Sequence, residues 1–330
     1  MDQEKNLWEP TIGDVLEARV RIAPHLPPTP LVQPLSLKAE LGCEIFVKCE
    51  NMQPVGAFKV RGGVNLAIVE RAAGVLPEAG MAAASTGNHG QSVAYAARLV
   101  GVPAVIFAPV GANPLKVRSM ERLGAQVILT GADFDEAREA CQRFAAERRM
   151  RYVHSANEPL LVAGVATAYL EAMLEVPDAD VMIVPIGAGS GASGAGIVGR
   201  ALRPQMRIIG VQAEGAPAVY RSFYSGRPES TETAATRAEG LATRVAFDYP
   251  LGLLRRNLDE IVLVSDDGML AAVKLLAETA HVVAEEAGAA SVAAAWQLRD
   301  QLKGKKVIAP ITGGNATAAQ LAEALRERVL

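Results

Sequence analysis

The chain repeats one arrangement of apolar and polar residues along most of its length. A short, almost wholly apolar run leads into a turn of small residues, and a longer segment with one apolar face follows. Strands of a buried parallel sheet are apolar on both faces, and helices connect one such strand to the next. The apolar runs predict strands over residues 44–48, 80–84, 104–108, 126–129, 181–184, 207–211 and 306–309. The alternation therefore predicts an α/β protein with mostly parallel sheets.

Helices are predicted between these strands and before the first of them. The first begins at Thr11, a residue that can cap a helix, with Asp14 three residues later. Prolines between residues 24 and 30 predict an irregular segment, and the polar stretch from Arg221 to Pro250 is predicted to be a loop. Further helices are predicted over residues 89–100, 114–123, 134–149, 160–175, 192–202, 266–280, 287–302 and 315–329.

Two domains of this kind are expected. A chain of 330 residues is longer than a single compact domain usually is. The succession of strand, turn and helix begins at about residue 51 and starts again near Tyr152. We therefore expect a small α/β domain over residues 51–151, inserted into a large domain formed by residues 1–50 and 152–330, each with three layers.

Composition and charge exclude several classes of protein. Half of the residues are hydrophobic and the net charge is −3, with no basic block that would favour nucleic acid. No segment reaches the roughly 18 apolar residues of a membrane-spanning helix. The polar start from Met1 to Asn6 does not resemble a leader peptide, so a cytoplasmic location is expected. Cys43, Cys49 and Cys141 lack metal-binding spacing and are expected to be buried.

One lysine is the strongest candidate for chemistry. Lys59 lies in the stretch Ala57-Phe58-Lys59-Val60-Arg61-Gly62, among apolar side chains and directly before a glycine-rich helix start. Loss of solvation in such a setting disfavours the charged form and lowers the pKa of a lysine. The lysine then becomes a usable nucleophile and base. The alternative is a surface lysine that begins an ordinary helix.

Three turns follow predicted strands and open predicted helices. They are Ser85 to Gly90, Gly187 to Gly191 and Ile311 to Asn315. Backbone N–H groups at such helix starts bind anions, and small residues let them close around a phosphate. Parallel sheets collect ligands beyond the carboxyl ends of their strands, where the turns and Lys59 could meet. Taken singly, each turn could instead be a plain capping or structural turn.

In chain order, these motifs resemble those of the fold type II pyridoxal-phosphate enzymes, the group that contains threonine dehydratase, serine dehydratase and serine racemase. The resemblance covers nearly the whole chain and implies two α/β domains, as in the tryptophan synthase β subunit, with the cofactor between them. It rests on Glu50 to Pro54, Phe58-Lys59, Ser85 to Gly90, Asn157-Glu158-Pro159, Gly187 to Gly191, Glu239 to Ala242, Glu285 to Gly288 and Thr312 to Asn315.

The resemblance also implies roles for individual residues. Lys59 would bond the aldehyde of pyridoxal 5'-phosphate and take the α-proton of the substrate, and Thr86 stands where serine racemases carry a catalytic serine. The cofactor would be bound by Phe58, Lys59, Asn88, Gly187, Ala188, Gly189, Ser190, Gly191, Gly240, Glu285 and Thr312. The substrate would be bound by Ser85, Thr86, Gly87, Asn88, His89 and Asn157.

The expected activity is that of an ammonia-lyase. A hydroxyl at Thr312, unlike a carboxylate, gives no strong reason to keep the pyridine nitrogen protonated, which favours prompt loss of a β-substituent. The resemblance thus implies elimination of water from L-threonine or L-serine to give a 2-oxo acid and ammonia. The alternatives are a serine racemase, a dehydratase for an unusual β-hydroxy amino acid of the phenylserine type or from hydroxyectoine breakdown, and a pyridoxal-phosphate-binding regulatory protein.

The chain departs from the family pattern at several positions. Ala188 and Ser190 interrupt a phosphate loop that usually has four glycines, and residues 161–167 lack the Gly-Gln-Gly of many dehydratases. Glu214 matches a cation ligand of some relatives, but Tyr220 stands where a carboxylate would complete the site, so no full metal site is expected. The chain ends without a regulatory domain, so feedback inhibition is not expected. Relatives are usually homodimers or homotetramers, and the same is expected here.

Overall fold

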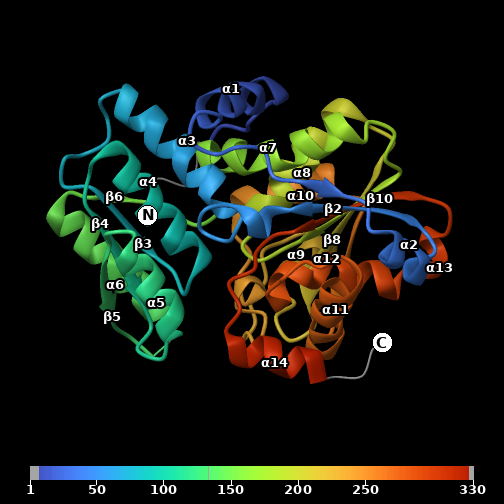
Figure 1. The fold of residues 1–330 in the computed structure, drawn as a ribbon. Helices are drawn as coiled ribbons and strands as arrows, with labels where there is room; N and C mark the ends of the chain where they lie inside the picture. The colour runs from blue at the N-terminus through green and yellow to red at the C-terminus, as the bar shows by residue number, and fades with distance from the viewer. Residues whose placement is uncertain (1–6, 133, 327–330) are drawn as a thin grey trace.

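The chain folds around two separate β-sheets, which lie in the left and right halves of Figure 1. The computed structural model describes residues 7–132 and 134–326. Strands β3 to β6 come from one continuous part of the chain and form the smaller sheet. The larger sheet joins strands that precede and follow this part. The smaller sheet is thus interposed, in sequence, between strands of the larger one.

The larger sheet has six described strands in the order β1-β2-β10-β7-β8-β9. Strand β1 runs antiparallel to β2, and the other neighbouring pairs are parallel. Strand β7 is buried along its whole length, which is why its sequence is apolar without alternation. The bounds are β1 (Leu31–Val32), β2 (Glu44–Cys49), β7 (Val181–Pro185), β8 (Arg207–Ala213), β9 (Glu260–Val264) and β10 (Lys306–Ile311).

Helices cover both faces of this sheet, each over its own hydrophobic core. One face packs against α2 (Leu35–Leu41), α11 (Asp266–Thr279), α12 (Glu286–Gln297) and α14 (Ala318–Arg326). The other packs against α1 (Ile12–Ile22), α7 (Pro159–Glu175), α8 (Ser190–Leu202), α9 (Ala218–Ser225) and α10 (Asp248–Asn257). Short helical turns complete this half: η1 (Glu50–Met52), η2 (Glu239–Leu241) and α13 (Arg299–Leu302).

The smaller sheet has four described strands in the order β5-β4-β3-β6, and all of them are parallel. Their bounds are β3 (Met81–Ala84), β4 (Ala104–Ala108), β5 (Gln126–Leu129) and β6 (Arg151–Tyr152). One face packs against α3 (Lys59–Ala72), α4 (Asn88–Val100) and α5 (Pro114–Arg122), and the other against α6 (Phe134–Arg148).

Helix α3 lies where the two halves meet. It packs against α4 of the small half and α7 of the large half. Small residues permit the close approach to α7: a Cβ at Gly62 would lie 2.7 Å from Leu161, and one at Gly164 would lie 2.5 Å from the Arg61 carbonyl oxygen. The first turn of α3, which carries Lys59, is therefore held at the junction.

The structure confirms the α/β class and contains the predicted strands. It also contains elements that the pattern did not predict, namely β1, α2, β6, α9, α10 and β9. The predicted loop from Arg221 to Pro250 is wrong at both ends, because α9 extends into it and α10 begins within it. Both helices bury an apolar face, such as Leu251 and Leu254 of α10.

Other details differ in extent. The predicted helix over residues 287–302 is interrupted at Leu298, and the last helix begins at Ala318, later than predicted. Its predicted end, and the polar start from Met1 to Asn6, lie outside the described residues. The three cysteines are buried, as expected. Among residues 7–132 and 134–326, the helices include none that is long and apolar enough to cross a membrane.

Candidate active site

Lys59 begins α3 with its amino group between the two halves of the molecule. Its Nζ donates hydrogen bonds to Ser190 Oγ, at 2.7 Å, and to the Ser155 carbonyl oxygen, at 3.1 Å. Burial withholds water from the ammonium group and lowers the pKa of Lys59 from 10.5 to about 8. An appreciable share of the side chain is thus neutral near that pH, as a nucleophile or base must be.

A buried ion network anchors the turn that carries Lys59. The Arg61 guanidinium donates to both oxygens of Glu50, at 2.7 and 2.8 Å, and to both oxygens of Glu171, at 2.7 and 2.8 Å. Lys48 Nζ lies 2.7 Å from Glu171. Two cations and two carboxylates thereby balance in a region that is almost closed to water. Strand β2, α3 and α7 are tied together two residues from Lys59.

The glycine loop forms the N-terminus of α8 and faces Lys59. The backbone N–H groups of residues 187–192 donate no hydrogen bond to the residues that the structure describes. Gly189 has a φ of +102°, a conformation that favours glycine. A Cβ at Gly187 would lie 2.2 Å from the Gly240 carbonyl oxygen, and one at Gly191 would lie 3.1 Å from the Phe58 ring. The loop is therefore a cradle of N–H groups at a positive helix end.

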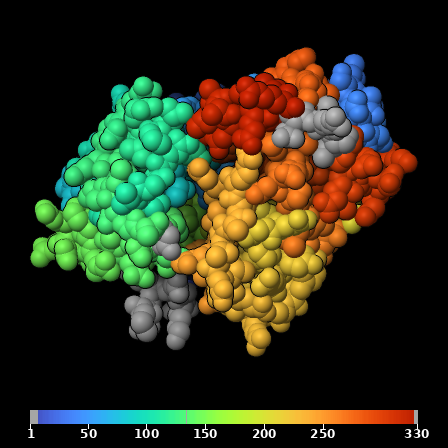
Figure 2. Space-filling view, turned by 90° about the horizontal axis from the view of Figure 1, so that it is seen from below, coloured from blue at the N-terminus to red at the C-terminus, as the bar shows by residue number. Residues whose placement is uncertain are grey.

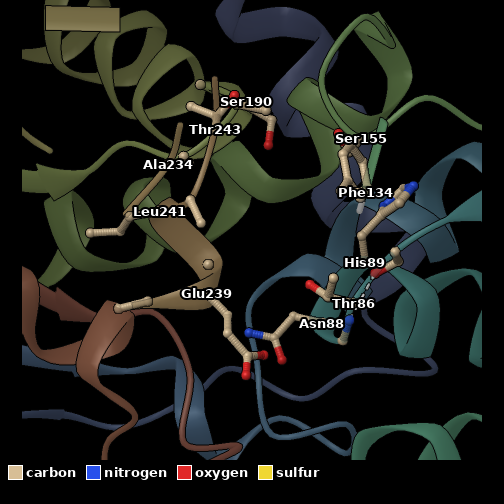
Figure 3. A pocket seen from close by; sticks show the side chains of 18 of the residues that line it. Thr86, Asn88, His89, Phe134, Ser155, Ser190, Ala234, Glu239, Leu241 and Thr243 are labelled. Atoms are coloured by element: carbon tan, nitrogen blue, oxygen red, sulfur yellow. Dashed lines mark hydrogen bonds between the residues drawn. The ribbon is translucent and has the colours of Figure 1, made fainter. Parts of the chain in front are cut away.

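A second turn, from Ser85 to His89, opens α4 on the other side. Ser85 Oγ accepts a hydrogen bond from the Gly87 N–H at 3.0 Å. His89 Nε2 lies 3.1 Å from the Val153 carbonyl oxygen, which can only accept, so Nε2 carries a proton. Burial is the main cause that lowers the pKa of His89 to about 3. His89 is therefore neutral and holds the turn in place, whereas the hydroxyl of Thr86 lies at the cavity (Figure 3).

The predicted cofactor-ring residues also come together. Asn88 Nδ2 donates to Glu285 Oε1 at 2.5 Å, across the junction between the two halves. The Thr312 carbonyl oxygen accepts from the Phe58 N–H at 3.0 Å, which places the last strand of the large sheet beside the start of α3. Gly240 lies on η2, opposite Gly187.

A single cavity of about 490 Å³ connects these groups between the two halves, which face each other in Figure 2. Thr86, Asn88 and His89 lie on one side of it, and Ser190, Leu241 and Thr243 on the other (Figure 3). Every predicted cofactor residue lines the cavity, and so do the predicted substrate residues from Ser85 to His89. Asn157 does not line it. Its N–H donates to His154 Nδ1 at 2.9 Å instead.

Charged residues that the sequence did not single out complete the wall. Lys116 of α5 is buried, with its Nζ 2.7 Å from Glu239 Oε2 and 3.3 Å from Glu285 Oε2. Arg138 and Arg244 both lie against Asp135, Arg138 at 3.1 Å. Helix α6 carries Asp135 and Arg138, whereas Arg244 belongs to the large half. Charged residues on a helix usually lie on its solvent-exposed face, so the sequence offers no reason to place Lys116, Asp135 or Arg138 at a cavity. Only the tertiary structure shows that they line it.

The expected position for a cation ligand lies apart from this cavity. Glu214 follows β8 and is exposed, and the Tyr220 N–H donates to Gln212 Oε1 at 2.8 Å. Within the described ranges, the structure contains no group of three or more His, Cys, Asp or Glu side chains that could hold a metal ion.

Comparisons with known proteins agree on one family. The sequence profile of the family described as "Pyridoxal-phosphate dependent enzyme" matches residues 22–313. An L-threonine ammonia-lyase of Thermotoga maritima is 40% identical over 92% of this chain and 75% of its own length. An L-threo-3-hydroxyaspartate ammonia-lyase of Saccharomyces cerevisiae is 35% identical over 93% of each chain. The structure of maize serine racemase superposes with a TM-score of 0.90 at 30% identity, covering 96% of this chain and 97% of that one.

Proposed function

Because the chain belongs to the pyridoxal-phosphate-dependent enzymes, we propose that it is an ammonia-lyase that eliminates water from a small β-hydroxy amino acid. L-Threonine is the first proposed substrate and L-serine the second, and the products are a 2-oxo acid and ammonia. The relative from Thermotoga maritima is named for this activity, as an L-threonine ammonia-lyase. The observation that carries the proposal is the place of Lys59, a half-buried lysine of lowered pKa beside a cradle of backbone N–H groups.

The residues of the cavity fit the cofactor. The N–H groups of residues 187–192 and the positive end of α8 suit a phosphate, and Lys59 Nζ lies 2.7 Å from Ser190 of the same loop. Phe58 would lie against the ring, and Thr312 would offer the pyridine nitrogen a neutral hydroxyl. Asn88 would donate to the ring hydroxyl oxygen, with Gly240 and Glu285 along the ring edge.

Each part of the cavity then has a task in the elimination. When bound, the cofactor draws electrons away from the α-carbon of the substrate. Lys59 takes the α-proton on its Nζ, for which the lowered pKa is suited. The N–H groups of Thr86, Asn88 and His89, together with the Thr86 hydroxyl, bind the substrate carboxylate at the N-terminus of α4. The cavity between the two halves holds these groups beside one another.

The test is a substrate panel with the purified protein loaded with pyridoxal phosphate. The panel contains L-threonine, L-serine, D-serine, 3-phenylserine and L-threo-3-hydroxyaspartate, and it follows ammonia, 2-oxo acid and the chirality of the remaining substrate. Oxo acid from L-threonine or L-serine, lost in Lys59→Ala, supports the proposal. Inverted serine with little oxo acid would make the protein a racemase, and silence with all substrates would favour a binding role.

One observation favours a second candidate, an ammonia-lyase for a β-hydroxy amino acid with a carboxylate side chain. Arg138 and Arg244 line the cavity from opposite halves of the molecule and share Asp135 between them. A guanidinium binds a carboxylate through two parallel hydrogen bonds. The relative from Saccharomyces cerevisiae is named for such a substrate, L-threo-3-hydroxyaspartate.

Substitution of Arg138 distinguishes the two candidates. If Arg138 binds a side-chain carboxylate, Arg138→Leu lowers kcat/KM for L-threo-3-hydroxyaspartate about ten- to a hundredfold, the loss of one charged hydrogen bond. The value for L-threonine then changes little. Arg143→Leu is the matched control, because Arg143 lies on the same helix with 68% of its side chain exposed. Equal losses with both substrates, or with both variants, would reject the second candidate.

The other expectations stay predictions. They concern a possible mono- or divalent cation, a homodimer or homotetramer, and a cytoplasmic location. Size-exclusion chromatography with light scattering measures the oligomeric state directly.

A further inference from the structure

A chain of side-chain hydrogen bonds runs along the edge of the cavity and crosses between its two halves. The Asn315 amide nitrogen donates to the Val55 carbonyl oxygen at 2.9 Å and to Asn88 Oδ1 at 2.7 Å. Asn88 Nδ2 then donates to Glu285 Oε1 at 2.5 Å, and Lys116 Nζ lies 3.3 Å from the other Glu285 oxygen. Asn88 and Lys116 belong to the small half, whereas their partners Asn315 and Glu285 belong to the large half.

The groups at the two ends of this series of hydrogen bonds determine which amide atoms donate and which accept. The Val55 carbonyl oxygen can only accept a hydrogen bond, so Asn315 must present its nitrogen to it. The same nitrogen also donates to Asn88, so the Asn88 side chain must accept this hydrogen bond with its oxygen. At the far end, the Glu285 carboxylate also only accepts, so Asn88 must present its nitrogen there. A flipped Asn88 amide would set nitrogen against nitrogen at Asn315 and oxygen against oxygen at Glu285.

Two glycines leave room for the side chains that form these hydrogen bonds. A Cβ at Gly56 would lie 2.7 Å from Asn315 Oδ1. A Cβ at Gly313 would lie 2.2 Å from Glu285 Oε1 and 3.1 Å from Asn88 Nδ2. Lys116 lies beside Glu285. Although burial by itself lowers the pKa of this lysine, the carboxylates of Glu285 and Glu239 raise it overall. The glycines therefore give the hydrogen-bonded side chains the space they need, and the positive charge of Lys116 stabilises the position of Glu285.

We propose that Asn315 is a positioning residue that acts through Asn88. An amide nitrogen carries two hydrogens, and Glu285 takes one of those on Asn88. The orientation imposed by Asn315 leaves the second N–H of Asn88, which lines the cavity, for the ring hydroxyl oxygen of the cofactor. This inference rests on the proposed function, because it assumes that pyridoxal phosphate binds where the cavity residues fit it.

The experiment reads the bound cofactor without substrate. The variants are Asn315→Asp, which puts an acceptor where a donor is needed, and Asn315→Leu, which removes the amide at similar volume. Each is loaded with pyridoxal phosphate, and the balance between the absorption bands of the charged and uncharged ring oxygen is recorded with the Kd for the cofactor. We expect the balance to move towards the uncharged form and the Kd to rise about tenfold, as for one hydrogen bond to a charged group.

Two further variants separate positioning from general damage. Asn51→Leu is the matched control, because Asn51 donates to the Val283 carbonyl oxygen at 3.0 Å and does not bond to Asn88. Its spectrum should match that of the unsubstituted protein. In a background of Asn88→Ala, substitution of Asn315 should have little additional effect on the spectrum, because its effect passes through the Asn88 amide.

Several results would overturn the inference. These are an unchanged spectrum in both Asn315 variants, an equal change in Asn51→Leu, or a full additional change in the Asn88→Ala background. Failure of the unsubstituted protein to bind pyridoxal phosphate would reject the proposed function and this inference with it. Normal cofactor binding without lyase activity would reject only the proposed function, since the spectrum needs no substrate.

Discussion

Replacement of Arg61 by methionine tests whether the buried ion network holds the first turn of α3. The side chain is completely buried, and its guanidinium bonds to Glu50, Glu171 and, at 3.1 Å, the Thr167 hydroxyl. Methionine fills much of the volume but leaves an excess of buried negative charge. Removal of one partner from a buried ion pair costs about 3–5 kcal/mol. That is a large fraction of the roughly 5–15 kcal/mol by which domains are stable.

The measurement is urea unfolding followed by circular dichroism. We expect a lower midpoint in Arg61→Met at a similar slope, because the slope follows the surface exposed on unfolding. The double variant Arg61→Met/Glu50→Met should recover part of the loss, since one charge of each sign is removed and the Lys48–Glu171 pair, at 2.7 Å, remains.

Arg71 on the same helix provides the control. Its Nη1 lies 2.6 Å from Glu78, but the two side chains are 43% and 81% exposed. Exposed pairs are worth about 0–1 kcal/mol, so Arg71→Met should change the free energy of unfolding little. A loss in Arg61→Met no larger than that in Arg71→Met would refute the argument that the buried network stabilises this turn. If Arg61→Met/Glu50→Met were less stable than Arg61→Met, the argument that the loss comes from an unbalanced buried charge would be refuted.

Three further predictions concern the cavity and the core. Because the pKa of Lys59 is lowered to about 8, covalent capture of pyridoxal phosphate by the apoprotein should accelerate as pH rises through about 8 and level off above it; stopped-flow absorbance measures the rate, and a profile centred near 10.5 would contradict the lowered pKa. Gly187→Ala should weaken cofactor binding about tenfold or more, since the added Cβ would lie 2.2 Å from the Gly240 carbonyl oxygen. Fluorescence titration gives the Kd, and an unchanged value would show that the loop relaxes freely. Burial raises the pKa of the Cys141 thiol to about 12, so it should react with a thiol reagent only as fast as the protein unfolds; rapid labelling of the native protein would contradict this.

Much of the fold could be predicted from local patterns, and the gaps have physical causes. Strand β9 contains the apolar run Ile261-Val262-Leu263-Val264, a signal that could have predicted it. Helix α2 begins after Pro34 and ends at Gly42, whose φ of 68° is typical of a helix end, but it has only seven residues in a proline-rich region. Strands β1 and β6 have two residues each and exist only through their pairing with β2 and β3.

The candidate site shows the same division. Lys59, Ser85 to His89, the glycine loop and Thr312 could be predicted because each lies in a turn after a strand, where local chemistry is visible in the sequence. Lys116 lies instead on the amphipathic helix α5, where a lysine usually faces solvent. Only the tertiary structure brings Lys116 between Glu239 of η2 and Glu285, the residue that precedes α12.

Local sequence alone contains the periodicity of strands and helices, the small residues of the turns and the order of the motifs. These features depend on neighbours along the chain, and they were sufficient to identify the family and to predict a set of residues that line one cavity. The tertiary structure alone decided which charged side chains meet at the cavity, such as Asp135 with Arg244 and Asn315 with Asn88. Those contacts join residues 109 and 227 positions apart, and they depend on how the two halves of the molecule pack, for which no local pattern carries a signal.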